Sequence, residues 1–221
     1  MWWYQAGRRF GIVLMVLTTG LVAWSFPLFL EAGVLTQTPQ TLHKGLFLVS
    51  NPKMPDPHFQ KSVILICEYG SAGAIGLVLN KPTKIPLSKV FPSMPGIQKN
   101  RQTLFIGGPV QPKGILMLFR STIAVENTRP VLNEVYWGGN QKMVALMVLH
   151  PKPHEQFHIY AGYAGWGRGQ LEAEVASGAW KTLPADAANL FEKDPATLWN
   201  NLFDSNPDSH RFISYPSPNR P

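Results

Sequence analysis

Residues 62–80, SVILICEYGSAGAIGLVLN, decide the fold that we expect for this chain. The segment SVILICE (62–68) is rich in β-branched residues and predicts a buried strand, and AIGLVLN (74–80) predicts a second one. Residues 69–73 between them form a turn. Because two strands joined by so short a connection pair antiparallel, we predict a β-hairpin here.

Similar apolar runs on both sides of the hairpin predict further strands. GLFLVS (45–50) precedes it, and LFIGG (104–108) and GILMLFR (114–120) repeat the scheme of strand, Gly-Gly-Pro turn and strand. KMVALMVLH (142–150) and FHIYAGY (157–163) are predicted as two more strands, joined by PKPHEQ.

The pattern changes to helical spacing after the last of these strands. We predict short helices in QLEAEVASGAW (170–180), PADAANLFE (184–192) and DPATLWNNLF (194–203). In the last of these, Asp194 is placed to cap the helix and Pro195 to occupy its first position. Mostly antiparallel strands followed by short helices predict an α+β fold.

Composition allows a sizeable core but names no reaction. The chain has 221 residues, of which 45% are hydrophobic and 15% charged, and its net charge is +7. This mild basic excess is no argument for specific binding to nucleic acid. The single cysteine, Cys67, excludes an intramolecular disulfide.

An uncharged apolar run, FGIVLMVLTTGLVAWSFPLFL (10–30), is long enough as a helix to span a membrane. Arg8 and Arg9 precede it, so the positive-inside rule predicts a single-pass anchor in the cell inner membrane, with the rest of the chain across it. A cleaved secretory signal ending near residues 23–25, or residues added by an upstream start codon, are the alternatives.

The chain therefore divides into four predicted parts. Residues 1–30 form the membrane anchor or signal segment, and residues 31–41 form a polar linker. Residues 42–203 form the globular domain. Residues 204–221 are polar and rich in proline and are expected to fray.

Three blocks of the sequence, residues 46–83, 105–121 and 160–180, resemble the YqgE/AlgH family of bacterial proteins and occur in the family's order. The resemblance runs from about Leu42 to Phe203. It implies a bifurcated sheet curled into a pseudo-barrel. It also implies no established enzymatic activity and a transcription-related regulatory role. Family members are ordinarily cytoplasmic, which is the alternative localisation for this chain. Tyr69 stands where the family commonly has a histidine, so no role resting on that histidine is expected here.

The glycines of residues 165–169 form G-x-G-x-G, with Gln170 at the sixth position. This departs from the dinucleotide-binding fingerprint, and no Walker loop is present. Arg168 would face an anion at the following helix start, but Glu172 and Glu174 would repel a phosphate there. We expect these glycines to shape the backbone and predict no cofactor.

Three histidines, His150, His154 and His158, recur at a spacing of four. On a helix they would align as zinc ligands, but the prolines between them forbid that helix. His150 and His158 could still meet across a strand hairpin. We predict no metal site, and retain these residues, with Glu68, for the alternative of a metal-dependent hydrolase-type enzyme.

Basic residues supply a candidate contact surface for a protein, lipid head groups or nucleic acid. It consists of the cations Lys81, Lys84, Lys89 and Arg168 and the neutral Asn80, and Lys99 and Arg101 follow Lys89 in the sequence. No helix-turn-helix, zinc finger or basic helix accompanies it, so sequence-specific binding of nucleic acid is unsupported, though not excluded.

No catalytic set emerges from the remaining reactive residues. Cys67 falls on the apolar face of its strand, where a thiol without a neighbouring base is inert. Asp56 and Glu68 are isolated carboxylates. We therefore predict a non-enzymatic regulatory or protein-interaction module with an unknown protein partner, tethered to the membrane by residues 10–30.

Overall fold

The computed structural model describes residues 41–123, 126–139 and 141–204. The predicted anchor (10–30) lies outside the described residues, as do nearly all of the predicted linker and tail, so these assignments stay predictions. Among the described residues, no helix is long and apolar enough to cross a membrane.

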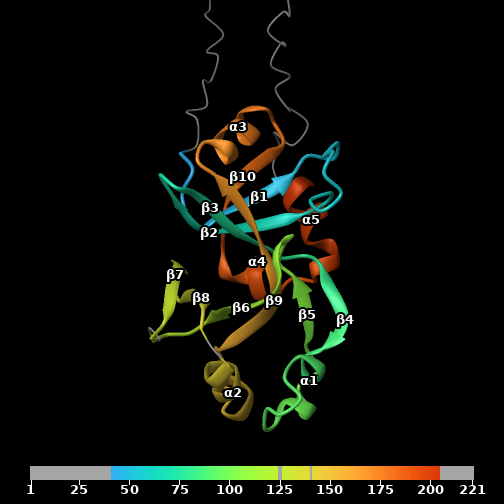
Figure 1. Cartoon of the computed structure of the whole chain (residues 1–221), viewed down its shortest axis with the longest axis vertical. Helices are drawn as coiled ribbons and strands as arrows, with labels where there is room; N and C mark the ends of the chain where they lie inside the picture. Colours follow the sequence, from blue (N-terminus) through green and yellow to red (C-terminus); the bar gives the residue numbers. More distant parts are fainter. Residues whose placement is uncertain (1–40, 124–125, 140, 205–221) are drawn as a thin grey trace, which may run out of the picture. The chain divides into compact units, whose positions relative to one another are not determined.

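The described part of the chain contains ten strands and five short α-helices (Figure 1). The strands are β1 (Leu46–Ser50), β2 (Val63–Gly70), β3 (Gly73–Val78), β4 (Pro82–Pro86), β5 (Thr103–Ile106), β6 (Val110–Arg120), β7 (Thr128–Leu132), β8 (Val135–Gly138), β9 (Gln156–Gly167) and β10 (Trp180–Pro184). The helices are α1 (Leu87–Val90), the 3₁₀ turn η1 (Ile97–Lys99), α2 (Gln141–Leu149), α3 (Gln170–Ala176), α4 (Ala187–Phe191) and α5 (Pro195–Asp204). A large, mostly antiparallel sheet with short helices confirms the predicted α+β class.

Strand β9 is the place where the sheet divides. The main path runs β10-β1-β2-β3-β9-β6-β8-β7. Residues 164–167 of β9 pair with β3, whereas its earlier residues pair with β6 on one side and, in parallel, with β5 on the other. Figure 1 shows β9 crossing from the β1–β3 region to the β5–β6 region. Within the described residues, β10 and β7 each pair on one side only, so the path is open at both ends.

The predicted hairpin is confirmed. β2 and β3 pair antiparallel from Ile64 opposite Val78 to Gly70 opposite Gly73. The first residues of β2 are fully buried, as expected for a β-branched run with helices or strands on both faces. The register shifts between Ile66 and Glu68, so that Cys67 is the extra residue of a β-bulge.

The Gly-Gly-Pro segment does not make the predicted hairpin turn. β5 and β6 form where the apolar runs place them, but they lie on opposite sides of β9 rather than against each other. The Gly107 N–H donates to the carbonyl of Ala161, and a Cβ on Gly107 would lie only 2.3 Å from the Gly162 carbonyl oxygen. The glycine pair therefore lets the chain pass closely against β9.

The prediction of a strand at 142–150 is wrong, because this segment forms helix α2. An almost uninterrupted apolar run fits a strand and a buried helix equally well by period. Its leucine, alanine, methionine and lysine residues favour a helix. The buried residues Met143, Val144 and Met147 recur at helical spacing.

The C-terminal helices are confirmed with changed ends. α5 begins at Pro195, and the Asp194 carboxylate caps it by accepting from the Ala196 N–H at 2.9 Å. α3 ends at Ala176 instead of continuing, and Trp180 begins strand β10, which pairs with β1. Asp186 caps α4 through the Asn189 N–H.

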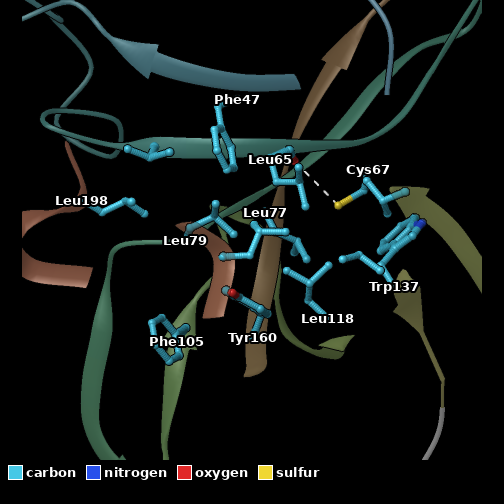
Figure 2. Packing of buried hydrophobic residues seen from close by; sticks show 14 of the residues in the cluster. Phe47, Leu65, Cys67, Leu77, Leu79, Phe105, Leu118, Trp137, Tyr160 and Leu198 are labelled. Carbon is cyan, nitrogen blue, oxygen red and sulfur yellow. Dashed lines mark hydrogen bonds between the residues drawn. The ribbon is translucent and has the colours of Figure 1, made fainter. Parts of the chain in front are cut away.

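Buried apolar residues of the described ranges gather into three clusters. One fills the space between β1–β3, β9 and helices α4 and α5, and Figure 2 shows Phe47, Leu77 and Tyr160 among its side chains. A second lies around Trp166 and Trp180 beneath α3. In the third cluster, side chains of α1, η1 and α2 pack against β6 and β9, and this packing fixes the position of α2.

Candidate functional site

Helix α2 is apolar on more than the face that it buries. Met143, Val144 and Met147 pack into the cluster with β6 and β9. Leu146 remains 60% exposed and Leu149 45% exposed. A helix that is apolar all round is normally enclosed, so this one leaves apolar side chains without a covering element among the described residues.

A pocket of about 580 Å³ lies beside this exposed face of α2. Its apolar part is made by Phe119 of β6, by Met143 and Met147, and by the exposed side chains of Ile123 and Leu146. Polar and charged residues complete the lining, namely Ser121, Glu126, Asn127, Lys142, His150, Lys152 and Glu155. We call this set of residues the α2 pocket.

The charged part of the α2 pocket carries both signs. Lys152 pairs with Glu155 at 2.8 Å between Nζ and Oε1. Lys142 and Glu126 are exposed and have no ion-pair partner among the described residues. An apolar floor with a few polar groups of both signs, in a volume of several hundred Å³, is typical of a site that binds a largely apolar group.

The α2 pocket is not predicted by the sequence analysis. Of the predicted site residues, only His150 lines it. The predicted strand at 142–150 does not show that Leu146 is exposed, because that exposure depends on the helical register of α2. The sequence feature that indicates the pocket is the second apolar face that residues 142–149 have when they are placed on a helix.

The three predicted metal ligands do not gather. His150 follows α2 at the pocket, His154 lies in the turn before β9, and His158 lies within β9. Because α2 replaces the expected strand, the hairpin that would have brought His150 to His158 does not exist. In the part of the chain that the structure describes, no three His, Cys, Asp or Glu side chains are grouped to hold a metal.

His158 instead lies in an aromatic environment. Its ring is parallel to that of Phe191, with centroids 5.5 Å apart, and meets Phe105 edge-on at 4.9 Å. Burial lowers the pKa of His158 to about 4. The imidazole is therefore neutral at pH 7 and serves as packing between β9, β5 and α4.

The other reactive residues have structural partners. Burial raises the pKa of the Cys67 thiol, and its sulfur lies 3.6 Å from the Leu65 carbonyl oxygen (Figure 2). Glu68 forms an ion pair with Arg129, whose guanidinium lies 5.9 Å from the ring centroid of Trp137. Glu68 thus connects β2 to the β7–β8 hairpin.

The glycine-rich stretch is held by hydrogen bonds within the chain. Glu174 Oε2 accepts from the indole N–H groups of Trp166 at 2.9 Å and Trp180 at 2.8 Å. Gly169 has a φ of 75°, as the turn from β9 into α3 requires. Gly165 and Gly167 belong to strand β9, so the turn is confined to the residues that follow Gly167.

The residues of the predicted contact surface lie in different surroundings. Asn80 is used internally, because its Oδ1 accepts from the Val63 N–H at 2.9 Å and its Nδ2 donates to the Lys61 carbonyl. Lys81 donates to the His58 carbonyl, and burial lowers the pKa of Lys81.

Lys84 on β4 and Lys89 on α1 are exposed. Arg168 is exposed in the turn before α3, and Figure 1 shows α3 at the opposite end of the described part from α1. The predicted set therefore does not form one continuous surface.

Comparisons with known proteins agree with this fold. Residues 47–209 match the model of the AlgH-like family. A UPF0301 protein of Cytophaga hutchinsonii is 30% identical over 79% of this chain and 96% of its own length. A UPF0301 protein of Thioalkalivibrio sulfidiphilus is 37% identical over 69% of this chain and 83% of its own length.

Two solved structures are also similar. The AlgH protein of Pseudomonas aeruginosa has a TM-score of 0.59 and 34% identity, covering 72% of this chain and 86% of that one. A Corynebacterium diphtheriae protein, with a TM-score of 0.64 and 23% identity, covers 77% of this chain and 90% of that one and shares the fold. With the family model matching most of the globular part, this chain belongs to the AlgH-like (YqgE/AlgH) family.

Proposed function

We propose that this chain is a non-enzymatic interaction module that binds an apolar segment of a partner protein in the α2 pocket. The observation that carries the proposal is the pocket of about 580 Å³ with Ile123 and Leu146 each 60% exposed at its edge. Exposed aliphatic side chains beside a concave apolar surface mark interaction sites on otherwise polar proteins.

The composition of the pocket supports a protein segment as its occupant. Met143 and Met147 form part of its apolar lining, and flexible thioether side chains adapt to helices of differing shape. An amphipathic helix binds such a groove through apolar residues on one face. The flanking charges of both signs, Lys142 and Glu126, suit a peptide that also carries both signs.

We further propose that the module has a regulatory role. The family resemblance supports it, since one branch of that family is linked to transcriptional control. A module of this kind acts by occupying or releasing a partner, which needs no catalytic group. The proposed tether through residues 10–30 would confine that action to the inner membrane, whereas without it the module would act in the cytoplasm.

Site-specific photo-crosslinking in living cells tests the proposal. The photoreactive residue p-benzoylphenylalanine replaces Leu146 in one strain and Ile106 in another, because Ile106 is 44% exposed on β5 and serves as the control. We expect a protein adduct from position 146 that is absent from position 106. Ile123→Glu in the same pocket should abolish that adduct.

Two results contradict the proposal. One is the same set of adducts from both positions, which indicates non-specific contact. The other is an absence of protein adducts at position 146 in cells that express the chain at its native level. Stoichiometric zinc in the purified full-length chain would instead favour the hydrolase alternative.

A further inference from the structure

We propose that the end of the molecule formed by β4, α1 and η1 binds the surface of an anionic lipid bilayer. Four exposed cations define this end, which we call the basic end: Lys84, Lys89, Lys99 and Arg101. The proposal concerns a surface separate from the α2 pocket and does not depend on the predicted membrane anchor.

Negatively charged residues are absent from the sequence around the basic end. Between Glu68 and Glu126 the sequence contains no aspartate or glutamate. The same stretch contains seven basic residues: Lys81, Lys84, Lys89, Lys99, Arg101, Lys113 and Arg120.

Two of these seven have partners. Lys81 donates to a backbone carbonyl, and Arg120 pairs with Glu134 at 3.5 Å and Glu192 at 3.8 Å. The four residues of the basic end have no carboxylate partner among the described residues. Their charge is therefore available to an anionic partner.

The fold brings the four residues of the basic end into one compact segment. The Leu87 N–H donates to the Gln102 carbonyl at 3.0 Å, which joins the start of α1 to the residue after Arg101. α1 also contacts both β4 and η1. The buried side chains of Leu87 and Ile97 anchor the segment in the core, so its cations are displayed on a fixed scaffold.

Exposed apolar side chains accompany the cations. Ile85 of β4 is 45% exposed, and Leu149 at the end of α2 is equally exposed. Leu149 lies against the loop before η1, as the short distance of 2.9 Å between the Leu149 Cδ2 and a Cβ built on Gly96 shows. Cations that contact phosphates and aliphatic side chains that enter the headgroup boundary are the combination found at bilayer surfaces.

A lipid surface fits these residues better than nucleic acid does. Phe91, the aromatic residue of the segment, is buried and offers no platform for base stacking. α1 has four residues and is too short to lie in a groove of DNA. Exposed Ile85 and Leu149 gain nothing from a phosphate backbone, whereas a bilayer interface removes them from water.

The expected preference is large enough to measure. Each basic side chain near an anionic bilayer raises partitioning roughly fivefold, so four together give roughly several hundredfold over a neutral bilayer at moderate ionic strength. High salt should remove most of this difference, because the contacts are solvent-exposed and screened.

Spin-label accessibility tests the proposal on the full chain. Ser93→Cys places a nitroxide on the exposed loop between α1 and η1, and Ser71→Cys places the control on the β2–β3 turn. Cys67 is buried and should not be labelled. The labelled chains are placed in nanodiscs of phosphatidylcholine, with or without phosphatidylglycerol.

We expect the label at 93 to lose contact with a water-soluble nickel chelate, and to gain contact with oxygen, only when phosphatidylglycerol is present. The label at 71 should remain in water with both lipids. Because residues 10–30 occur in every sample, any binding by them affects both lipid compositions and both labels, and the comparison isolates the basic end.

A charge-neutral variant, Lys84→Gln/Lys89→Gln/Lys99→Gln/Arg101→Gln, should lose the lipid-dependent change while retaining the circular dichroism of the parent. Lys113→Gln/Arg168→Gln, which neutralises exposed cations elsewhere, should keep the change. Equal accessibility in both lipids, or an unchanged response in the charge-neutral variant, overturns the proposal. So does a response of the label at 93 to a random-sequence DNA duplex but not to phosphatidylglycerol.

Discussion

The imidazole of His158 lies parallel to the ring of Phe191, with the centroids 5.5 Å apart and an angle of 7° between the planes. This contact joins β9 to α4 and depends on an uncharged imidazole, because the stacked pair is largely removed from water. Burial lowers the pKa of His158 from its usual 6.5 to about 4. The stability of the fold therefore depends on pH through this residue.

The sign of the dependence follows from proton uptake. Between pH 6.5 and 4 the unfolded chain binds a proton at His158 that the folded chain does not, so stability falls as pH falls through this window. The loss contributed by His158 is about 3 kcal/mol by pH 4. Urea unfolding of the parent and of His158→Phe at several pH values measures it.

The phenylalanine variant should lose less stability on acidification than the parent by about that amount. His154→Gln, in the exposed turn before β9, should behave like the parent. Identical pH profiles for the parent and His158→Phe would show that the fold does not lower the pKa of His158.

Glu174 is predicted to be essential to the packing of α3. Its Oε2 accepts from two indole N–H groups, and removing it leaves the buried side chains of Trp166 and Trp180 without these acceptors. We expect Glu174→Ala to lower the free energy of unfolding by about 2–4 kcal/mol. Glu172→Ala on the same helix removes one exposed contact to Tyr69 and should cost less than about 1 kcal/mol. Equal effects of the two substitutions in urea unfolding would argue against the double indole contact.

The close contact of Gly107 with β9 can be tested by adding a single methyl group. In Gly107→Ala the new Cβ would lie 2.3 Å from a backbone oxygen and 3.1 Å from Tyr160 Cβ, so backbone must move. We expect a loss of at least about 2 kcal/mol. Gly70→Ala is the matched control, because nothing lies within 4 Å of its Cβ, and its effect should stay within about 0.5 kcal/mol. Thermal unfolding followed by circular dichroism compares the two.

Local signals explain which elements could be predicted. The β2–β3 hairpin depends on two apolar runs and a short turn, all inside residues 62–80. α5 depends on Asp194 and Pro195, which mark a helix start whatever surrounds them. The family resemblance, carried by three separate blocks, is confirmed by the comparisons.

The elements that were not predicted depend on their tertiary contacts, which local sequence patterns do not reveal. β4 and β7 contain Pro82, Pro86 and Pro130, which favour loops but are tolerated in strands at the edge of a sheet. The pairing of β5 with β9 requires knowledge of where β9 lies. The almost continuous apolar sequence of α2 has no periodicity that distinguishes a buried strand from a helix.

The α2 pocket could not have been found by motif. Its walls come from the end of β6 with the residues after it, and from α2 with the residues after it, which are separated in sequence by the β7–β8 hairpin. Leu146 is recognisable as an exposed apolar residue only after the helical register of α2 is known. The spacing of His150 from His154 and His158 makes it a metal candidate, whereas in the structure it lines the pocket because it directly follows α2.

The predicted anchor has its own test. A reporter that is active only in the cytoplasm, fused after Pro221, should be inactive if residues 10–30 insert with Arg8 and Arg9 on the cytoplasmic side. The same fusion lacking residues 1–30 should be active and controls for folding of the reporter. Activity in the full-length fusion would contradict the predicted orientation and favour the cytoplasmic alternative.

The α2 pocket predicts an unusual separation between stability and binding. Leu146→Glu replaces a side chain that is 60% exposed, so the free energy of unfolding should change by less than about 0.5 kcal/mol. Met147→Glu, one residue along the helix and buried, places a carboxylate in the core and should cost at least about 3 kcal/mol. Leu146→Glu should nevertheless remove most of the fluorescence of the apolar dye ANS bound to the folded protein, because the charge enters the mouth of the pocket. Unchanged dye binding in a fully folded Leu146→Glu variant would show that this pocket is not the apolar binding surface of the molecule.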